Sequence, residues 1–498
     1  MSTERLTYRF GPLERRGLLG PVRTGQAATL AAGGLIAIVI LDRSPSATGA
    51  LVATLLFATS VVVAVAPIGR RTAGEWVPVA ASFALRRLRR RARFRSRAPL
   101  SGIAVSGLRL GRPMLGEPVA DPPPSLRRLR ILETAYRDHA VGVLTSERGR
   151  RAVAVLACRV IAFSLLDIAA QERRLSRWGL VLSGASGTPI RRIQWLERTV
   201  PAQGDELTRW VAAERDPAVP LRGAPMIDSY LELIGTTTRA TQEHEILVAI
   251  EVDARRVRDR GSDAVVGALI EQTERVAQGL EAAEVSVLGA LGPSQLSRAL
   301  RTAFDPYARS ELAALELANP RDTRLNEAAA WPLGAREWWD HYRSDGALHA
   351  TYWIGGWPRV DVSPMFMDAL LGRSSAVRTV AVTFEPLPPD RSTREVESAI
   401  TRDQADRELR RRFGQSETAR QRQAMEATAR REAELAAGHG EVRLAGFVTV
   451  TGRDPDDLRH ACAEVHEHAA RARLELHRMY GQQADAFTFT LPLCRGLR

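Results

Sequence analysis

Two uncharged apolar stretches dominate the N-terminal part of the chain. They run from Thr24 to Leu41 and from Ser44 to Gly69, and only Asp42 and Arg43 separate them. A helix of about 20 apolar residues is long enough to cross a bilayer core about 30 Å thick. The pattern therefore predicts a two-helix transmembrane hairpin, in which the second helix is long enough to tilt.

Arginine flanks both stretches and predicts the orientation of the hairpin. The chain has no lysine, which is typical of the GC-rich genomes of actinobacteria, so all 70 basic side chains are arginine. They are dense before Thr24 and again from Arg70 to Arg97, whereas Arg43 alone lies between the stretches. Because basic flanks stay in the cytoplasm, we expect two spans of the inner membrane with both termini cytoplasmic. A cleaved signal peptide is disfavoured, since a second apolar stretch follows at once.

These flanks hold almost all of the excess positive charge. The net charge of the chain is +13, and residues 1–97 supply all but one unit of it. Residues 98–498 are therefore close to electroneutral, and the sequence gives no reason to expect nucleic-acid binding. The cysteines Cys158, Cys462 and Cys494 are too few for a disulfide framework and fit a reducing compartment.

The segment after the hairpin has the composition of an interfacial helix. Apolar side chains share one helical face just before the arginine block, at Trp76, Val79, Ala80, Phe83 and Ala84. We expect this helix to lie among lipid headgroups. Its membrane anchors would be Trp76, Arg86, Arg87, Arg89, Arg90 and Arg91. A stop-transfer flank with no further role is the alternative. These elements form a first domain, residues 1–97, and a semi-rigid Pro/Gly-rich linker follows at 98–126.

The rest of the chain predicts an α+β domain on the cytoplasmic side. Short apolar runs at 141–144 and 152–156 flank a turn at Gly149 and predict a β-hairpin. A helix from Leu165 to Leu180 and a strand from Ile190 to Val200 follow. The fold class is thus α+β, a transmembrane hairpin followed by a cytoplasmic domain that alternates strands and helices.

One pattern occurs twice in this domain. A strand at 246–252, a helix at 262–283 and a strand at 285–288 resemble a strand at 442–450, a helix at 454–479 and a strand at 486–490. Two strand–helix–strand units of similar length predict two related lobes, residues 127–330 and 331–498. The second lobe carries a charged helical stretch at 393–437, broken at Gly414, which predicts a helical hairpin arm. Its charges fit either a solvated face or a docking arm for a partner.

The sequence offers no persuasive catalytic, cofactor or metal site. Without lysine the chain cannot form a GxxxxGK[ST] phosphate loop or a Schiff base. His460, Glu464 and His468 share a helical face, but their order is not that of a known metal motif, so solvated helix side chains explain them better. Asp454 is better explained as a helix cap than as a cation ligand. We therefore expect a non-enzymatic protein.

Motifs along the chain resemble parts of conjugation systems. The hairpin with Glu75 and Trp76 looks like the small PrgI-like inner-membrane proteins. The later segments resemble, in order, the N-terminal non-motor domain of VirB-type conjugation ATPases. The matching residues are 141–155 with 163–166, 357–358 with 362–366, 380–386, and 482–487 with 491–493. The resemblance implies an interface for a separately encoded secretion ATPase. Its residues would be Trp357, Pro358, Gln482, Gln483, Phe487, Leu491, Pro492 and Leu493.

This resemblance implies a membrane platform of a type IV-like secretion or conjugation apparatus. The expected partners are membrane lipids, the cognate ATPase and other membrane subunits of a symmetric complex. An EccE-type component of type VII secretion is the alternative, since it also places paired spans before a soluble domain, and a membrane-bound enzyme is a further one. The tryptophan-rich stretch from Trp331 to Trp357 fits either core packing or an interface.

Overall fold

The computed structural model describes most of the chain, which divides into two compact units. The described residues are 24–68, 71–96, 120–137, 139–146, 149–159, 163–201, 225–226, 229, 242–259, 261–309, 312, 327–358, 360–372, 374–412, 419–436 and 440–497. The sheet unit comprises 93–396 and 430–498 with the first ten residues, and the helical unit comprises 11–92 and 397–429.

The helical unit begins with two apolar helices, α1 (Thr24–Arg43) and α2 (Ala47–Val65). Ser46 caps α2, because its hydroxyl accepts a hydrogen bond from the Gly49 amide at 3.1 Å. A two-stranded ribbon, β1 (Pro67–Ile68) and β2 (Arg71–Thr72), leads to α3 (Ala73–Leu88). The predicted charged arm consists of two helices, α11 (Pro389–Arg412) and α12 (Ala419–Ala436).

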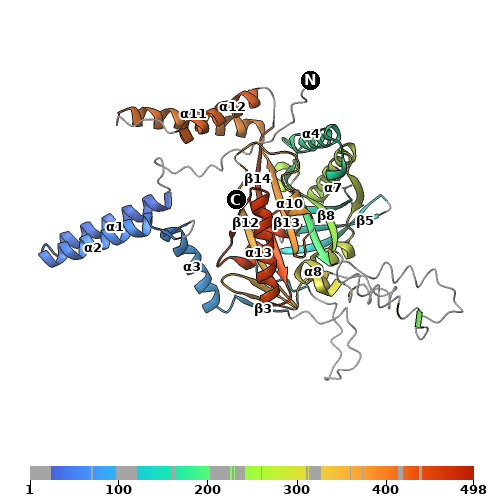
Figure 1. The fold of residues 1–498 in the computed structure, drawn as a ribbon, viewed down its shortest axis with the longest axis horizontal. Coiled ribbons are helices and arrows are strands. Elements are labelled where there is room, and N and C mark those ends of the chain that lie inside the picture. Colours follow the sequence, from blue (N-terminus) through green and yellow to red (C-terminus); the bar gives the residue numbers. More distant parts are fainter. Residues whose placement is uncertain are drawn as a thin grey trace. The chain divides into compact units, whose positions relative to one another are not determined.

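One antiparallel sheet of 13 strands forms the core of the sheet unit (Figure 1). Its strands lie in the order β3-β10-β11-β12-β14-β13-β7-β8-β6-β5-β4, with β15 beside β12 and β9 beside β6. The bounds in the first half are β4 (Leu129–Tyr136), β5 (His139–Ser146), β6 (Arg151–Arg159), β7 (Ile190–Pro201), β8 (Gln242–Asp253) and β9 (Ser286–Ala290). In the second half they are β10 (Gly334–Glu337), β11 (Tyr342–Ser344), β12 (Ala347–Gly356), β13 (Val377–Pro386), β14 (Val442–Gly452) and β15 (Glu475–Arg478).

The two halves repeat the same order of elements. The helices of the first half are α4 (Ile168–Gly184), α7 (Ser262–Ala282) and α8 (Pro293–Phe304), and those of the second are α10 (Asp368–Leu371), α13 (Pro455–Arg471) and α14 (Gln483–Phe487). From β6 to β9 the chain runs β-α-β-β-α-β with the ferredoxin-like strand order 4-1-3-2. From β12 to β15 it has the same strand order, and the helices α11 and α12 are inserted between β13 and β14. The second strands of the two repeats, β7 and β13, pair with each other. The related units predicted from the sequence are thus halves of one continuous sheet.

Each face of the sheet has its own layer. On one face, α4 and α7 cover the first half and α13 covers the second, over cores that meet at Trp195. On the other face, α8, α14 and the C-terminal residues pack over β6, β7 and β8 through Leu300, Phe304, Phe487 and Leu491. Consecutive residues of β8, such as Val248 and Ala249, therefore enter different cores, as the period of a strand requires.

Several sequence predictions differ from the structure. The helix expected from Asp454 to Met479 ends at Arg471, and the chain then forms β15. The strand expected at 486–490 is wrong, because these residues form the end of α14 and a 3-10 turn, Thr488–Thr490. Residues assigned to the membrane segment also form an edge strand of the sheet, β3 (Arg93–Arg95), which pairs with β10.

Candidate functional site

Large apolar side chains on α1 and α2 are exposed rather than packed into a core. They include Leu35, Ile38, Leu41, Leu51, Leu55, Phe57, Val62 and Val65. Soluble monomeric proteins rarely expose an apolar surface of this extent. Among the described residues, α2 is the helix that by length and composition can cross a membrane. This surface indicates association with a membrane.

Small residues let α1 and α2 approach each other closely. A Cβ atom added at Gly33 would lie 2.2 Å from the Ser60 hydroxyl oxygen, and Ala37, Ala53 and Ala64 are buried. The Gln26 side-chain amide donates to the Ala64 carbonyl at 2.9 Å, which ties the two helices together at one end. Close packing of small residues, with a polar side chain as a tie, is typical of helices that associate in lipid.

The helix α3 exposes an apolar stripe at helical spacing. Val77, Leu85 and Leu88 are 59%, 45% and 82% exposed, and Ala81 and Ala84 lie between them. The predicted stripe differs, since its member Val79 is buried and Trp76 and Phe83 are half-buried. Of the predicted anchors, Arg87, Arg89, Arg90 and Arg91 are exposed, and Arg86 is half-buried and donates to the Ser82 hydroxyl at 3.4 Å. Their contact with lipid stays a prediction.

The residues predicted to contact an ATPase lie mostly inside the sheet unit. Gln483, Phe487, Leu491, Pro492, Leu493 and Pro358 are buried, whereas Trp357 and Gln482 are half-buried. The Phe487 ring packs against the rings of Phe304 and His349, with centroids 5.1 and 4.6 Å apart. Gln483 accepts a hydrogen bond from the Thr351 amide at 2.8 Å. Six of the eight side chains thus pack inside the sheet unit, and contact of any of the eight with an ATPase stays a prediction.

The tryptophan-rich stretch has both buried and exposed members. Trp331 is 2% exposed and belongs to the core beneath α8, whereas Trp338 and Trp339 are 37% and 36% exposed. The exposed pair follows β10 directly in the chain. Trp331 is therefore a core residue, whereas Trp338 and Trp339 lie at the surface.

A polar seam lies where the two halves of the sheet join. Residues 488–497, which we call the C-terminal strap, cross the sheet at β7 and β13. The Gln194 side chain accepts from the amides of Leu493 and Cys494 at 3.0 and 2.8 Å and donates to the Phe489 carbonyl at 2.8 Å. From β13, the Thr383 hydroxyl donates to the Arg495 carbonyl at 3.0 Å. The strap therefore bonds to the strand of each half that lies at the junction.

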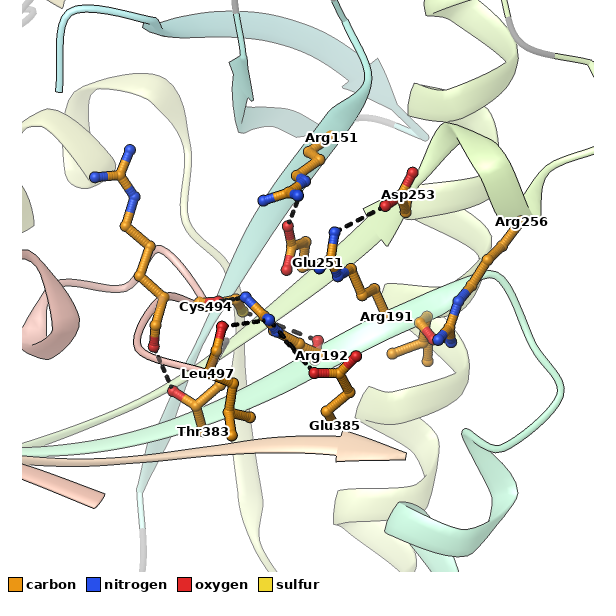
Figure 2. Close-up of polar contacts among 12 residues, drawn as sticks. Arg151, Arg191, Arg192, Glu251, Asp253, Arg256, Thr383, Glu385, Cys494 and Leu497 are labelled. Atoms are coloured by element: carbon orange, nitrogen blue, oxygen red, sulfur yellow. Dashed lines mark hydrogen bonds and ion pairs between the residues drawn. The ribbon is translucent and has the colours of Figure 1, made fainter. Parts of the chain in front are cut away.

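Arg192 is the charged centre of this seam (Figure 2). Its guanidinium lies 3.3 Å from the Glu385 carboxylate and donates to the carbonyls of Cys494 and Leu497 at 3.2 and 2.6 Å. The side chains of Arg192 and Glu385 are only 6% and 10% exposed. On the neighbouring strand, burial raises the pKa of Glu251, although Arg192 and Arg151 oppose this effect. The seam is thus a buried charge network that depends on the strap for its completion.

The other candidate groups have structural roles. Burial raises the pKa of the Cys158 thiol to about 11 and that of Cys494 well above its usual range, so both thiols stay protonated at neutral pH. Glu464, considered above with two histidines, accepts hydrogen bonds from the Ser374 hydroxyl and the Ser375 amide at 2.7 and 2.8 Å. Within the described residues no cluster of three His, Cys, Asp or Glu side chains is arranged to hold a metal ion.

Sequence reasoning missed the seam residues. Arg192 and Gln194 alternate with Ile193 and Trp195, which is the usual pattern of a strand with one solvated face. The C-terminal strap, distant in the sequence, covers that face at Arg192 and Gln194. An arginine and a glutamine at alternate positions of a central strand were the available signal.

A comparison with protein families finds one similarity. Residues 240–354 match the family described as "putative type VII ESX secretion system translocon, EccE". The matched region runs from β8 through most of β12 and so includes α7, α8 and the hairpin that carries Trp338. No curated protein matches the chain. The match and the apolar helix together indicate a membrane component of a secretion system, and they give no support to the resemblance to conjugation proteins.

Proposed function

We propose that this protein is a membrane-anchored structural subunit of a type VII-like secretion complex. The match of residues 240–354 to the EccE family carries the proposal. The exposed apolar surface of α1 and α2 supports it, because a subunit of a membrane complex needs an anchor. The type VII role, which was the alternative from the sequence, is thus preferred to the type IV role.

In this proposal α1 and α2 both span the inner membrane, with the sheet unit on its cytoplasmic side. The antiparallel packing of α1 against α2 at Gly33 supports two spans. If α2 alone crossed the membrane, α1 would have to separate from α2 and stay at the membrane surface. The arginines on both outer flanks support cytoplasmic termini.

The proposed role is architectural rather than enzymatic. The buried charges at the β7–β13 junction are paired and tie two halves together, which is the arrangement of a rigid scaffold. The proposed partners are the other membrane subunits and the secretion ATPase of the same system. Because the motif residues around Phe487 are buried, we place the ATPase contact on exposed parts of the sheet unit.

Isolation of the intact chain from native membranes tests this function. An affinity-tagged full-length chain should co-isolate in mild detergent with the other type VII membrane subunits of its host. Deleting the gene should stop export of that system's substrates, and the tagged chain should restore it. A tagged membrane protein of unrelated function serves as the control. Isolation of the chain alone, together with normal export in the deletion strain, would refute the proposal, and co-isolation with a conjugation ATPase would favour the type IV role.

A further inference from the structure

Three arginines stand side by side at one end of the sheet. In the ladder, Arg336 of β10 lies directly opposite Arg93 of β3 on one side and Arg343 of β11 on the other. Directly opposite residues of antiparallel strands point to the same face, with Cβ atoms about 5 Å apart. The three guanidinium groups therefore form one row, which we call the arginine ladder.

This arrangement has an electrostatic cost in the protein alone. Like charges at directly opposite positions destabilise a sheet. Arg93 and Arg343 are exposed and Arg336 is half-buried. In the part of the chain that the structure describes, none of the three forms an ion pair with a carboxylate. A row of three arginines without acidic partners is suited to bind anions from outside the protein, and the guanidinium fork matches both phosphate and carboxylate groups.

Two exposed tryptophans lie at the end of the ladder. Trp338 and Trp339 form the turn between β10 and β11, and the Arg336 guanidinium stacks over the Trp338 ring at 4.0 Å from its centroid. A hydrogen bond closes the turn, since the Trp338 amide donates to the His341 carbonyl at 2.8 Å. Exposed tryptophan beside arginine is the composition that proteins place at the membrane–water interface.

We propose that the arginine ladder and the Trp338–Trp339 turn bind the anionic phospholipid headgroups of the membrane. The inference rests on the membrane anchorage proposed above and adds a second, lipid-specific contact made by the sheet unit. Its occupant follows from the chain itself. Only residues 89–92 separate the end of α3 from β3, so the covalent chain keeps Arg93 within about 18 Å of the end of that helix. A nucleic acid would have no such reason to be close.

A fluorophore quenched by lipid headgroups tests this contact in the full-length chain. The three native cysteines are buried, so a cysteine introduced by Asp340→Cys, in the turn beside Trp339, can be labelled selectively. Leu288→Cys, 60% exposed on β9 in the other half of the sheet, is the reference position. The chain is inserted into nanodiscs of phosphatidylcholine with or without phosphatidylglycerol, each containing a headgroup-attached quencher.

We expect strong quenching at position 340 in the discs with phosphatidylglycerol, weak quenching without it, and little at position 288. Each Arg→Gln substitution in the ladder should lower the ratio of docked to undocked protein about fivefold, because one arginine near an anionic surface contributes about that factor. The matched controls replace exposed arginines on α7 and α13 and remove the same charge; they are Arg275→Gln, Arg459→Gln and Arg471→Gln. These substitutions should leave quenching unchanged.

Equal quenching at positions 340 and 288, or quenching at 340 that ignores phosphatidylglycerol or the ladder, would overturn the proposal. Binding of duplex DNA by the arginine ladder, in discs where the fluorophore at position 340 is not quenched, would also overturn the proposal. A chain that fails to co-elute with the discs would instead refute the membrane anchorage itself. If a variant with Arg93, Arg336 and Arg343 all replaced by glutamine loses its thermal unfolding transition, Arg343→Gln alone, at an exposed position, provides the same comparison.

Discussion

Replacing Arg192 by alanine should destabilise the sheet unit by about 3–5 kcal/mol, which is the usual cost of removing one partner of a buried ion pair. The substitution leaves the Glu385 carboxylate buried without its cation and removes the donors to the carbonyls of Cys494 and Leu497. The C-terminal strap should therefore detach more readily from β7. Urea denaturation of the full-length chain in nanodiscs measures the loss of stability.

A thiol reagent distinguishes strap release from general unfolding. Cys494 is 1% exposed, so it should react slowly in the wild type and much faster in Arg192→Ala below the unfolding transition. The matched control is Arg275→Ala, which breaks an exposed i,i+4 pair with Glu271 and should cost only about 0.3–0.5 kcal/mol. Wild-type stability and a protected Cys494 in the Arg192 variant would show that the seam does not hold the halves together.

Stability should fall as the pH is lowered from 6.5 to 4, and His349 should cause about 3 kcal/mol of that loss. Burial lowers the pKa of this imidazole to about 4, and the side chain is fully enclosed between Ser344 and Thr451. The unfolded chain takes up the proton near pH 6.5, whereas the folded protein does so only near pH 4. Protons therefore favour the unfolded state across this window, and the contribution is fully present above pH 6.5.

The His349→Gln variant isolates this contribution. Its free energy of unfolding should change less between pH 6.5 and pH 4 than that of the wild type, because the titrating group is absent from both states. His460→Gln, on the exposed surface of α13, is the control and should follow the wild-type curve. Parallel curves for wild type and His349→Gln would contradict the buried neutral imidazole.

The sequence predicted the elements with strong local patterns. The β5–β6 hairpin, β8, α7 and β14 were all expected, since their apolar residues repeat with the strand or helix period over many residues. The repetition of the strand–helix–strand pattern also predicted two related units. It could not show that β7 and β13 pair to make one sheet, because periodicity does not encode which strands are neighbours.

The missed elements are short or depend on distant contacts. The edge strand Arg93–Arg95 lies in an arginine block and has one apolar residue, so it looked like a membrane flank. The residues 486–490 alternate like a strand but turn as a helix, where Phe487 and Thr490 meet side chains of β12 and β14. The buried role of Arg192 likewise depends on the strap, almost the whole domain away in the chain.

We expect a two-span hairpin to hold the sheet unit at the cytoplasmic face of the membrane, and topology reporters test this claim most directly. Reporters fused after Gly20 and after Arg498 should both be cytoplasmic, whereas one inserted at Ser44, in the turn between α1 and α2, should be exterior. An exterior reporter after Arg498 would contradict the claim, because neither the sheet unit nor its arginine ladder would then face the cytoplasmic leaflet.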